Sequence, residues 1–147
     1  MSITIEICKK KLIFNPHFTT EFSSSKYYNI EKRKVKAVFD NENPQIAFEN
    51  GILSAKILGD IDHHCAKFVR ERIDSYIFEY KPSVVLLDLS SVDFMDSSGL
   101  GLILGRYNTA SEIGAEFRIC SPSSGVKKVL ELAGIERIIK IEGDLRV

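Results

Sequence analysis

Beyond residue 45, the pattern of apolar and polar positions predicts an alternation of short strands and amphipathic helices. Asn50-Gly51 lies between two strand-like runs, and this pair is a strong signal for a tight β-hairpin. The run Val84-Val85-Leu86-Leu87-Asp88-Leu89 is almost continuously apolar, as expected for a parallel strand that is covered on both faces. The predicted strands span residues 46–48, 52–58, 84–89, 117–120 and 138–141.

Three helices are predicted between these strands. The first follows Asp62, which is a good N-cap, and spans residues 63–80, and the second follows Asp96. The second ends at Gly114, and the third is expected to begin with Ser121-Pro122 as N-cap and first helical residue. Each has an apolar face at helical spacing: Cys65, Val69, Ile73, Tyr76, Ile77 and Tyr80; Leu100, Ile103, Leu104, Tyr107 and Ala110; Val126, Val129, Leu130 and Ala133.

This order of elements predicts an α/β fold with a mostly parallel sheet, an antiparallel N-terminal hairpin at its edge and helices packed on it. Residues 1–44 differ from the rest, because Lys9-Lys10-Lys11 and later charged runs break any long apolar face. We expect residues 1–44 to be a weakly structured extension or a small hairpin. The turn-rich segment Asn41-Glu42-Asn43-Pro44 would join them to a domain at residues 45–147.

Composition narrows the class of protein. The 147 residues suffice for one domain with a core. Basic and acidic residues number 20 each, and this balance argues against nucleic acid or a membrane surface as the main partner. The three cysteines have no metal or disulfide spacing, and no apolar run reaches the length of a membrane span or resembles a signal peptide. These features predict a cytoplasmic protein.

The most informative stretch is Asp96-Ser97-Ser98-Gly99-Leu100-Gly101, where a predicted strand passes through a short turn into a helix. The free N–H groups and positive dipole end of a helix N-terminus suit an added negative charge. Ser97 could simply cap the helix, but Gly99 and Gly101 leave little steric cover beside the hydroxyls and lower the helix propensity. A phosphoryl group would add about −1.5 to −2 charge here. The stretch therefore predicts a serine switch.

Other chemistry has weaker support. His63 and His64 are adjacent and would point in different directions on a helix, so they are poorly placed to share a metal ion. Asp88 and Asp93 have no neighbouring His or Lys in their motifs to complete a catalytic set. The glycines form neither a GxGxxG nor a Walker loop. We expect no catalytic residue, no metal and no cofactor.

Two motifs carry a resemblance to a known family. Gly59-Asp60-Ile61-Asp62-His63-His64 and residues 92–107 resemble bacterial anti-anti-sigma factors of the STAS domain family, the sporulation type in particular, over residues 45–142. The resemblance implies a STAS-like sandwich and partner switching in sporulation or stress transcription. The unphosphorylated protein would bind a cognate anti-sigma factor that is also a serine kinase, and so free a sigma factor. Phosphorylation would end the binding, and a PP2C-type phosphatase would restore it.

Carried over by residue, the resemblance implies that Ser97 is the phospho-acceptor, with Ser98 as the fallback. The implied partner-binding residues are Asp62, Asp96, Ser97, Ser98 and Gly99. The chain would act as a monomer or weak dimer. Two alternatives stay open: a STAS subunit of a larger signalling assembly, tethered by residues 1–44, and a weak nucleotide-binding protein.

Overall fold

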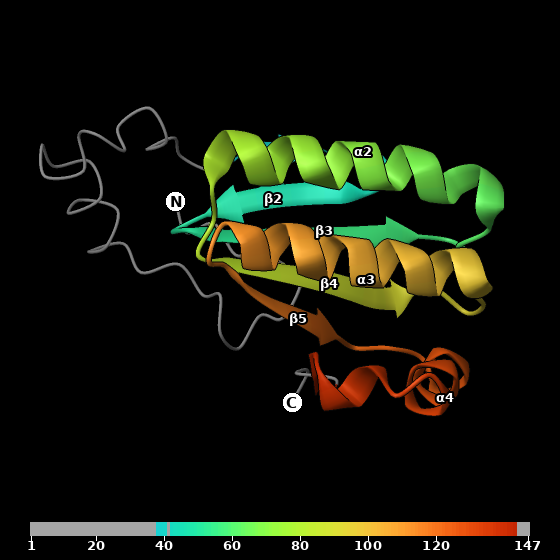
Figure 1. Ribbon diagram of the computed structural model, residues 1–147. Helices are drawn as coiled ribbons and strands as arrows, with labels where there is room; N and C mark the ends of the chain where they lie inside the picture. Colours follow the sequence, from blue (N-terminus) through green and yellow to red (C-terminus); the bar gives the residue numbers. More distant parts are fainter. Residues whose placement is uncertain (1–37, 41, 144–147) are drawn as a thin grey trace, which may run out of the picture.

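Strands in chain order build one sheet in the computed structural model, which describes residues 38–40 and 42–143 (Figure 1). The strands pair in the order β1-β2-β3-β4-β5-β6. The second strand pairs antiparallel with the first and with the third, and the remaining neighbours are parallel. Their bounds are β1 Val38–Asp40, β2 Gln45–Glu49, β3 Ile52–Leu58, β4 Val84–Ser91, β5 Glu116–Cys120 and β6 Lys140–Glu142.

The predicted mostly parallel sheet with an antiparallel hairpin is confirmed. Asn50 and Gly51 have φ values of 55° and 82°, which is the backbone that a two-residue hairpin turn between twisted strands requires. Strand β1 was not predicted and precedes Gln45, where the domain was expected to begin. The first 37 residues of the expected N-terminal extension lie outside the described residues.

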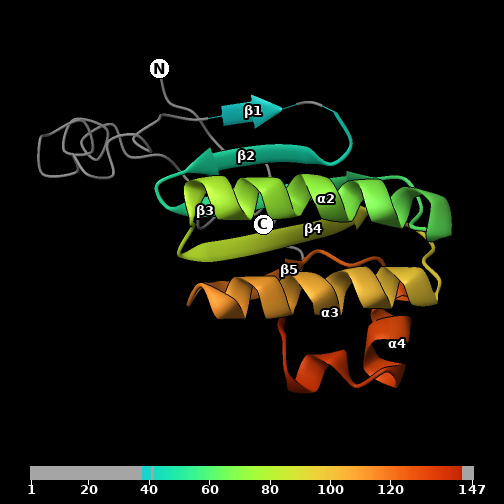
Figure 2. The same ribbon diagram turned by 45° about the horizontal axis from the view of Figure 1, so that its top comes forward.

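Two long helices lie side by side across one face of the sheet (Figures 1 and 2). Helix α2 spans His63–Tyr80 and helix α3 spans Ser97–Glu112, and both run back along the sheet from the end at which β3 and β4 finish. Helix α4, Ser124–Leu132, and the short 3-10 helix η2, Ile135–Arg137, contribute to the same core near β5 and β6. The predicted bounds of α2 are confirmed.

The core between these helices and the sheet is aliphatic. Helix α2 buries Val69, Ile73 and Ile77 at a spacing of four residues, as its sequence predicts. Strand β4 turns Val85, Leu87 and Leu89 toward the same core, each with no exposed surface. Burying one such side chain stabilises the fold by about 1.5–3 kcal/mol, so this one-sided core carries most of the fold's stability.

Strand β4 was expected to be covered on both faces, and residues 85–89 are all buried. Within the described segments, helices cover one face, and the other face carries a smaller apolar cluster of Ala47, Leu86 and Cys120. Leu86 and Asp88 of β4 lie on this second face and are 3% and 4% exposed. The continuous apolar run therefore predicted the burial of β4 correctly, but it could not predict which elements bury the strand.

The buried face of α3 differs from the predicted one. Its buried residues are Gly99, Leu102, Ile103, Arg106 and Ala110, whereas Leu104 is 36% exposed. The predicted face was rotated toward Leu104 because the pattern favours apolar side chains. The helix instead turns a glycine and an arginine inward, and both have partners there that the pattern cannot show.

The start of α4 also differs from the prediction. Ser123, and not Ser121, is the N-cap, and its hydroxyl accepts a hydrogen bond from the Val126 N–H at 3.3 Å. Ser121 has a left-handed φ of 53°, and its N–H donates to the Glu142 carbonyl of β6 at 3.0 Å. This residue continues the strand pairing, so the chain cannot begin the helix until after Pro122.

The last strand is shorter and later than predicted. Residues 135–137 form η2, and β6 begins only at Lys140, so Ile138 is 52% exposed while Ile139 is buried. Ala133, predicted on the apolar face of α4, is exposed and serves as its C-cap.

Candidate functional site

The loops that lead into α2 and α3 are tied together at one end of the molecule. Ile61 and Met95 form an isolated parallel bridge between the two loops. The Ile61 N–H donates to the Phe94 carbonyl at 3.1 Å, and the Asp96 N–H donates to the Ile61 carbonyl at 3.3 Å. Because both loops end in a helix, this bridge fixes the N-termini of α2 and α3 at the same edge of the sheet.

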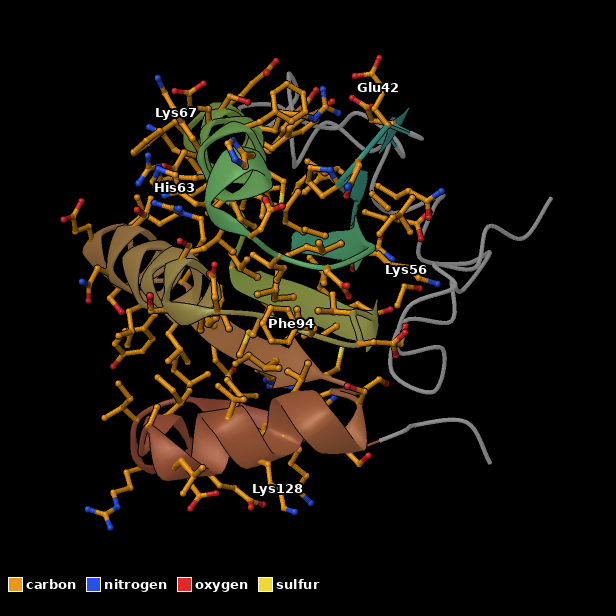
Figure 3. All side chains as sticks on the ribbon, turned by 90° about the vertical axis from the view of Figure 1, so that its right-hand side faces the viewer. Glu42, Lys56, His63, Lys67, Phe94 and Lys128 are labelled. Atoms are coloured by element: carbon orange, nitrogen blue, oxygen red, sulfur yellow. The ribbon has the colours of Figure 1, made fainter. Side chains whose placement is uncertain are left out.

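Figure 3 looks onto this end of the molecule, with His63 at the start of α2 and Phe94 in front of the sheet. One Asp60 carboxylate oxygen accepts the backbone N–H groups of Asp93 and Phe94, at 3.3 and 3.0 Å. The Phe94 backbone is therefore fixed, although its ring is 60% exposed. Neither Asp60 nor Phe94 was among the predicted site residues, and an exposed aromatic ring in a rigid turn is a feature that only the structure reveals.

Asp62 is the N-cap of α2, as predicted. One of its carboxylate oxygens accepts the backbone N–H groups of His64 and Cys65, each at 2.9 Å. These hydrogen bonds, led by the one from Cys65, lower the pKa of Asp62, so the exposed side chain carries a negative charge at neutral pH.

Asp96 plays the same part at α3, where its carboxylate accepts the Ser98 N–H at 2.7 Å. Ser97 is the first residue of the helix and is exposed, while Ser98 is half-buried. The structure thus places the Ser97 hydroxyl on the surface, at the positive end of a 16-residue helix and next to a capping carboxylate. An enzyme approaching this end of the molecule could reach it.

The two glycines of the motif have different roles. A Cβ on Gly99 would lie 2.8 Å from the Cβ of Met95, so the absence of a side chain lets α3 pack on its own entry loop. Gly99 is buried, which corrects the interpretation that it keeps the hydroxyls uncovered. A Cβ on Gly101 would meet no atom within 4 Å, and Gly101 is the glycine that leaves open space beside Ser98.

That open space is part of a shallow groove of about 250 Å³ between the first turns of α2 and α3. Its lining residues are His63, Ala66, Lys67, Arg70, Ser98, Gly101 and Leu102. Three of them are basic and come from α2, and neither Lys67 nor Arg70 was among the predicted site residues. The groove is the part of the site that the motif pattern missed.

A buried ion pair holds α2 and α3 together below the groove. The Arg106 Nε lies 2.6 Å from an Asp74 carboxylate oxygen, and the arginine side chain is only 5% exposed. Burial raises the pKa of Asp74 and lowers the pKa of Arg106, since it disfavours both charged forms, while the attraction between the two groups opposes each shift. This pair links the two helices directly, in addition to the aliphatic core that they share.

The described residues hold no group of three His, Cys, Asp or Glu side chains placed to bind a metal ion. The rings of His63 and His64 meet edge to face, with centroids 6.1 Å apart. The Asp88 carboxylate accepts the Ser90 N–H at 2.7 Å, and Asp93 is exposed. Over the same part of the chain, every helix is too short or too polar to cross a membrane.

These features define a class of protein. An α/β domain with two helix N-termini paired at one sheet edge matches the family model of the STAS domain, which covers residues 43–146. The chain belongs to the STAS domain family.

Curated relatives make the likeness more specific. An anti-sigma F factor antagonist of Paenibacillus polymyxa is 37% identical to the chain over 101 residues, which are 67% of this chain and 86% of that relative. An anti-sigma-B factor antagonist of Listeria monocytogenes serovar 1/2a is 30% identical over 87 residues, 58% of this chain and 75% of that relative. The solved structure of the anti-sigma factor antagonist SpoIIAA in its unphosphorylated form has a TM-score of 0.57 and 23% identity, and covers 74% of this chain and 90% of that one. The resemblance read from the two motifs and the STAS-like fold are both confirmed.

Proposed function

We propose that the chain is an anti-sigma factor antagonist: it binds a cognate anti-sigma factor that is also a serine kinase, frees a sigma factor, and is switched off by phosphorylation of Ser97. The observation that carries this proposal is the exposed Ser97 hydroxyl at the first turn of α3, held at the same edge as the exposed, ionised Asp62. The similarity to curated anti-sigma factor antagonists supports it.

The switch acts through the partner and not through the fold. A phosphoryl group on Ser97 adds about −1.5 to −2 charge. The helix N-terminus favours this charge, and Asp96 opposes it. Beneath a docked partner, the same dianion loses its water, and an uncompensated buried charge costs several kcal/mol. A modification that is almost neutral for the free protein therefore removes the complex.

The remaining parts of the cycle follow from the same proposal. The antagonist performs no catalysis itself and works in the cytoplasm, and a PP2C-type phosphatase regenerates the binding form. We also propose that residues 1–44 are an extension to the STAS domain at residues 45–147. The family model begins at residue 43, close to that boundary, although β1 adds to the sheet from within the extension.

The test begins by expressing each anti-sigma factor encoded in the same genome and titrating it with the full chain by calorimetry. Ser97→Ala should bind one of them like the wild type, and Ser97→Asp should bind it at least 100-fold more weakly, which is about 2.7 kcal/mol. Ser111→Asp, an equal charge change at the far end of α3, is the matched control and should bind normally. Equal affinities for Ser97→Ala and Ser97→Asp would refute the switch.

The acceptor is identified separately. Incubating that partner with ATP and the wild-type chain should add one phosphoryl group by intact mass, and peptide mapping should place it on Ser97. Ser98→Ala should still be modified, whereas Ser97→Ala should not. Modification that persists in Ser97→Ala and vanishes in Ser98→Ala would move the switch to the half-buried Ser98.

A further inference from the structure

The groove between α2 and α3 carries charge of one sign. His63, Lys67 and Arg70 follow one another at intervals of four and three residues, so they form a basic ridge along the side of α2 that faces α3. All three are exposed. Among the residues that the structure describes, no acidic side chain lines the groove. Asp74, the next residue along this side of α2, is paired with Arg106 at 2.6 Å, and the positive charge of Arg70 also acts on it.

The α3 side of the groove offers room and no charge. It consists of Ser98, Gly101 and Leu102. A glycine inside a helix costs about 1 kcal/mol relative to alanine. At position 99 the close contact with Met95 requires a glycine, but a Cβ at position 101 would meet no atom within 4 Å. The glycine at position 101 thus has no role in the packing of the described residues. The missing side chain leaves the basic ridge accessible.

We propose that this groove receives an acidic segment of the anti-sigma factor, with Asp or Glu side chains placed against Lys67 and Arg70. The proposal rests on the proposed function and names the chemistry of the partner's contact. The argument is charge complementarity, since the whole chain has zero formal net charge while the lining of this groove includes Lys67 and Arg70 and no acidic side chain.

The position of the groove links it to the switch. Ser98 lines the groove, and Ser97 precedes it at the start of the same helix. A phosphoryl group at this point brings about −1.5 to −2 charge beside the two permanent positive charges of Lys67 and Arg70. It neutralises the attraction for an acidic segment and repels that segment directly. Phosphorylation then ends binding by competing for the same cations, in addition to the cost of burying the phosphate.

The first test reverses the charge of the ridge. Lys67→Glu/Arg70→Glu should bind the anti-sigma factor identified above at least tenfold more weakly than the wild type. The affinity of the wild type should decrease between about 50 and 300 mM salt, and the variant should lose most of this salt dependence. Lys127→Glu/Lys128→Glu is the matched control, because both lysines are exposed on α4, and Lys128 and Lys67 lie at opposite ends of Figure 3. The control should bind within about twofold of the wild type.

The second test fills the groove without weakening the fold. Gly101→Leu replaces the glycine with a better helix former, so the thermal stability should hold or rise while the affinity falls at least tenfold. Gly105→Leu makes the same substitution on the same helix, outside the groove, where a Cβ would also meet nothing within 4 Å. It should keep normal affinity, which separates blocking of the groove from any general effect of leucine on α3.

The outcomes separate this inference from the proposed function. If Ser97→Asp loses binding but the charge-reversed ridge binds with the wild-type affinity and salt dependence, the switch stands and the groove inference is overturned. If the ridge variant binds normally but is no longer released by phosphorylation, the groove holds the phosphate instead of an acidic segment, and the inference is likewise overturned. If no anti-sigma factor binds the wild type, the proposed function itself fails.

Discussion

At the scale of single residues, neighbouring glycines in one motif have opposite consequences. Gly99→Ala should destabilise the protein by about 1–3 kcal/mol, because the added Cβ would lie 2.8 Å from the Cβ of Met95 and force the entry loop to shift. Gly101→Ala should stabilise it by about 0.5–1 kcal/mol, since the methyl group meets nothing and the helix gains propensity. Urea denaturation of the two variants measures both changes, and the same sign for both would contradict the assigned roles.

A second residue gives the fold a pH dependence. Glu49 of β2 is 6% exposed, and burial raises its pKa from 4.5 to about 7. The folded state therefore binds a proton more tightly than the unfolded chain, so the stability that protonation contributes is fully present below pH 4.5 and is lost as the pH rises through about 7. Between pH 4.5 and 8 the wild type should lose up to about 3 kcal/mol relative to Glu49→Gln, measured by denaturation at several pH values. Parallel pH curves would contradict it.

Sequence reasoning found the site residues whose role is local. Asp62 and Asp96 are N-caps because a short acidic side chain before a helix reaches the first free N–H groups, a relation contained within three residues of sequence. Gly99 was misread because its reason is a contact with Met95 that depends on how the chain enters the helix. Lys67 and Arg70 were missed because a basic residue on an exposed helix face has no signal until the facing helix is in place.

At the scale of elements, α2 and α3 are joined by a buried ion pair that hydrophobic patterning cannot predict. Arg106→Leu should destabilise the protein by about 2–4 kcal/mol, because it leaves Asp74 partly buried without its partner. The double variant Asp74→Leu/Arg106→Leu should be more stable than the single variant, since no charge is then left uncompensated. A double-mutant cycle with chemical denaturation measures the coupling. Additive single effects would show that the two side chains do not act as a pair.

The accuracy of the predicted elements follows the same division between local and distant causes. The bounds of α2 were predicted because an N-cap and a regular apolar spacing lie within the helix itself. The buried face of α3 was not predicted correctly, because the helix turns Gly99 toward Met95 and Arg106 toward Asp74 on another helix. The start of α4 was misplaced because the Ser121 N–H is committed to Glu142, a partner 21 residues further along the chain. Elements were predicted well where the interactions that determine their bounds lie within the element itself.

At the scale of the whole molecule, a mostly parallel sheet was predicted because a helical segment separates each strand from the next after the hairpin, and β3 to β6 are parallel neighbours. Among the described residues the helices lie on one face of the sheet, and this could not be predicted, since a strand buried by a helix and a strand buried in another way have the same apolar pattern. Strand β1 was missed because three residues are too few to establish a period.

The arrangement of the whole molecule makes the switch a surface event. The phospho-acceptor lies outside the core, on the first turn of a helix whose start is fixed by backbone hydrogen bonds to the neighbouring loop. Phosphorylation of Ser97 should therefore change the free energy of unfolding by less than about 1 kcal/mol, because the favourable helix dipole and the repulsion from Asp96 nearly cancel. The affinity for the anti-sigma factor should fall at least 100-fold in the same sample, or about 2.7 kcal/mol. Parallel thermal denaturation and calorimetric titration of the phosphorylated and unphosphorylated chain measure both quantities. A loss of stability as large as the loss of binding would mean that phosphorylation acts by unfolding α3, whereas a stable but non-binding phosphoprotein is what a rigid helix start with an exposed hydroxyl requires.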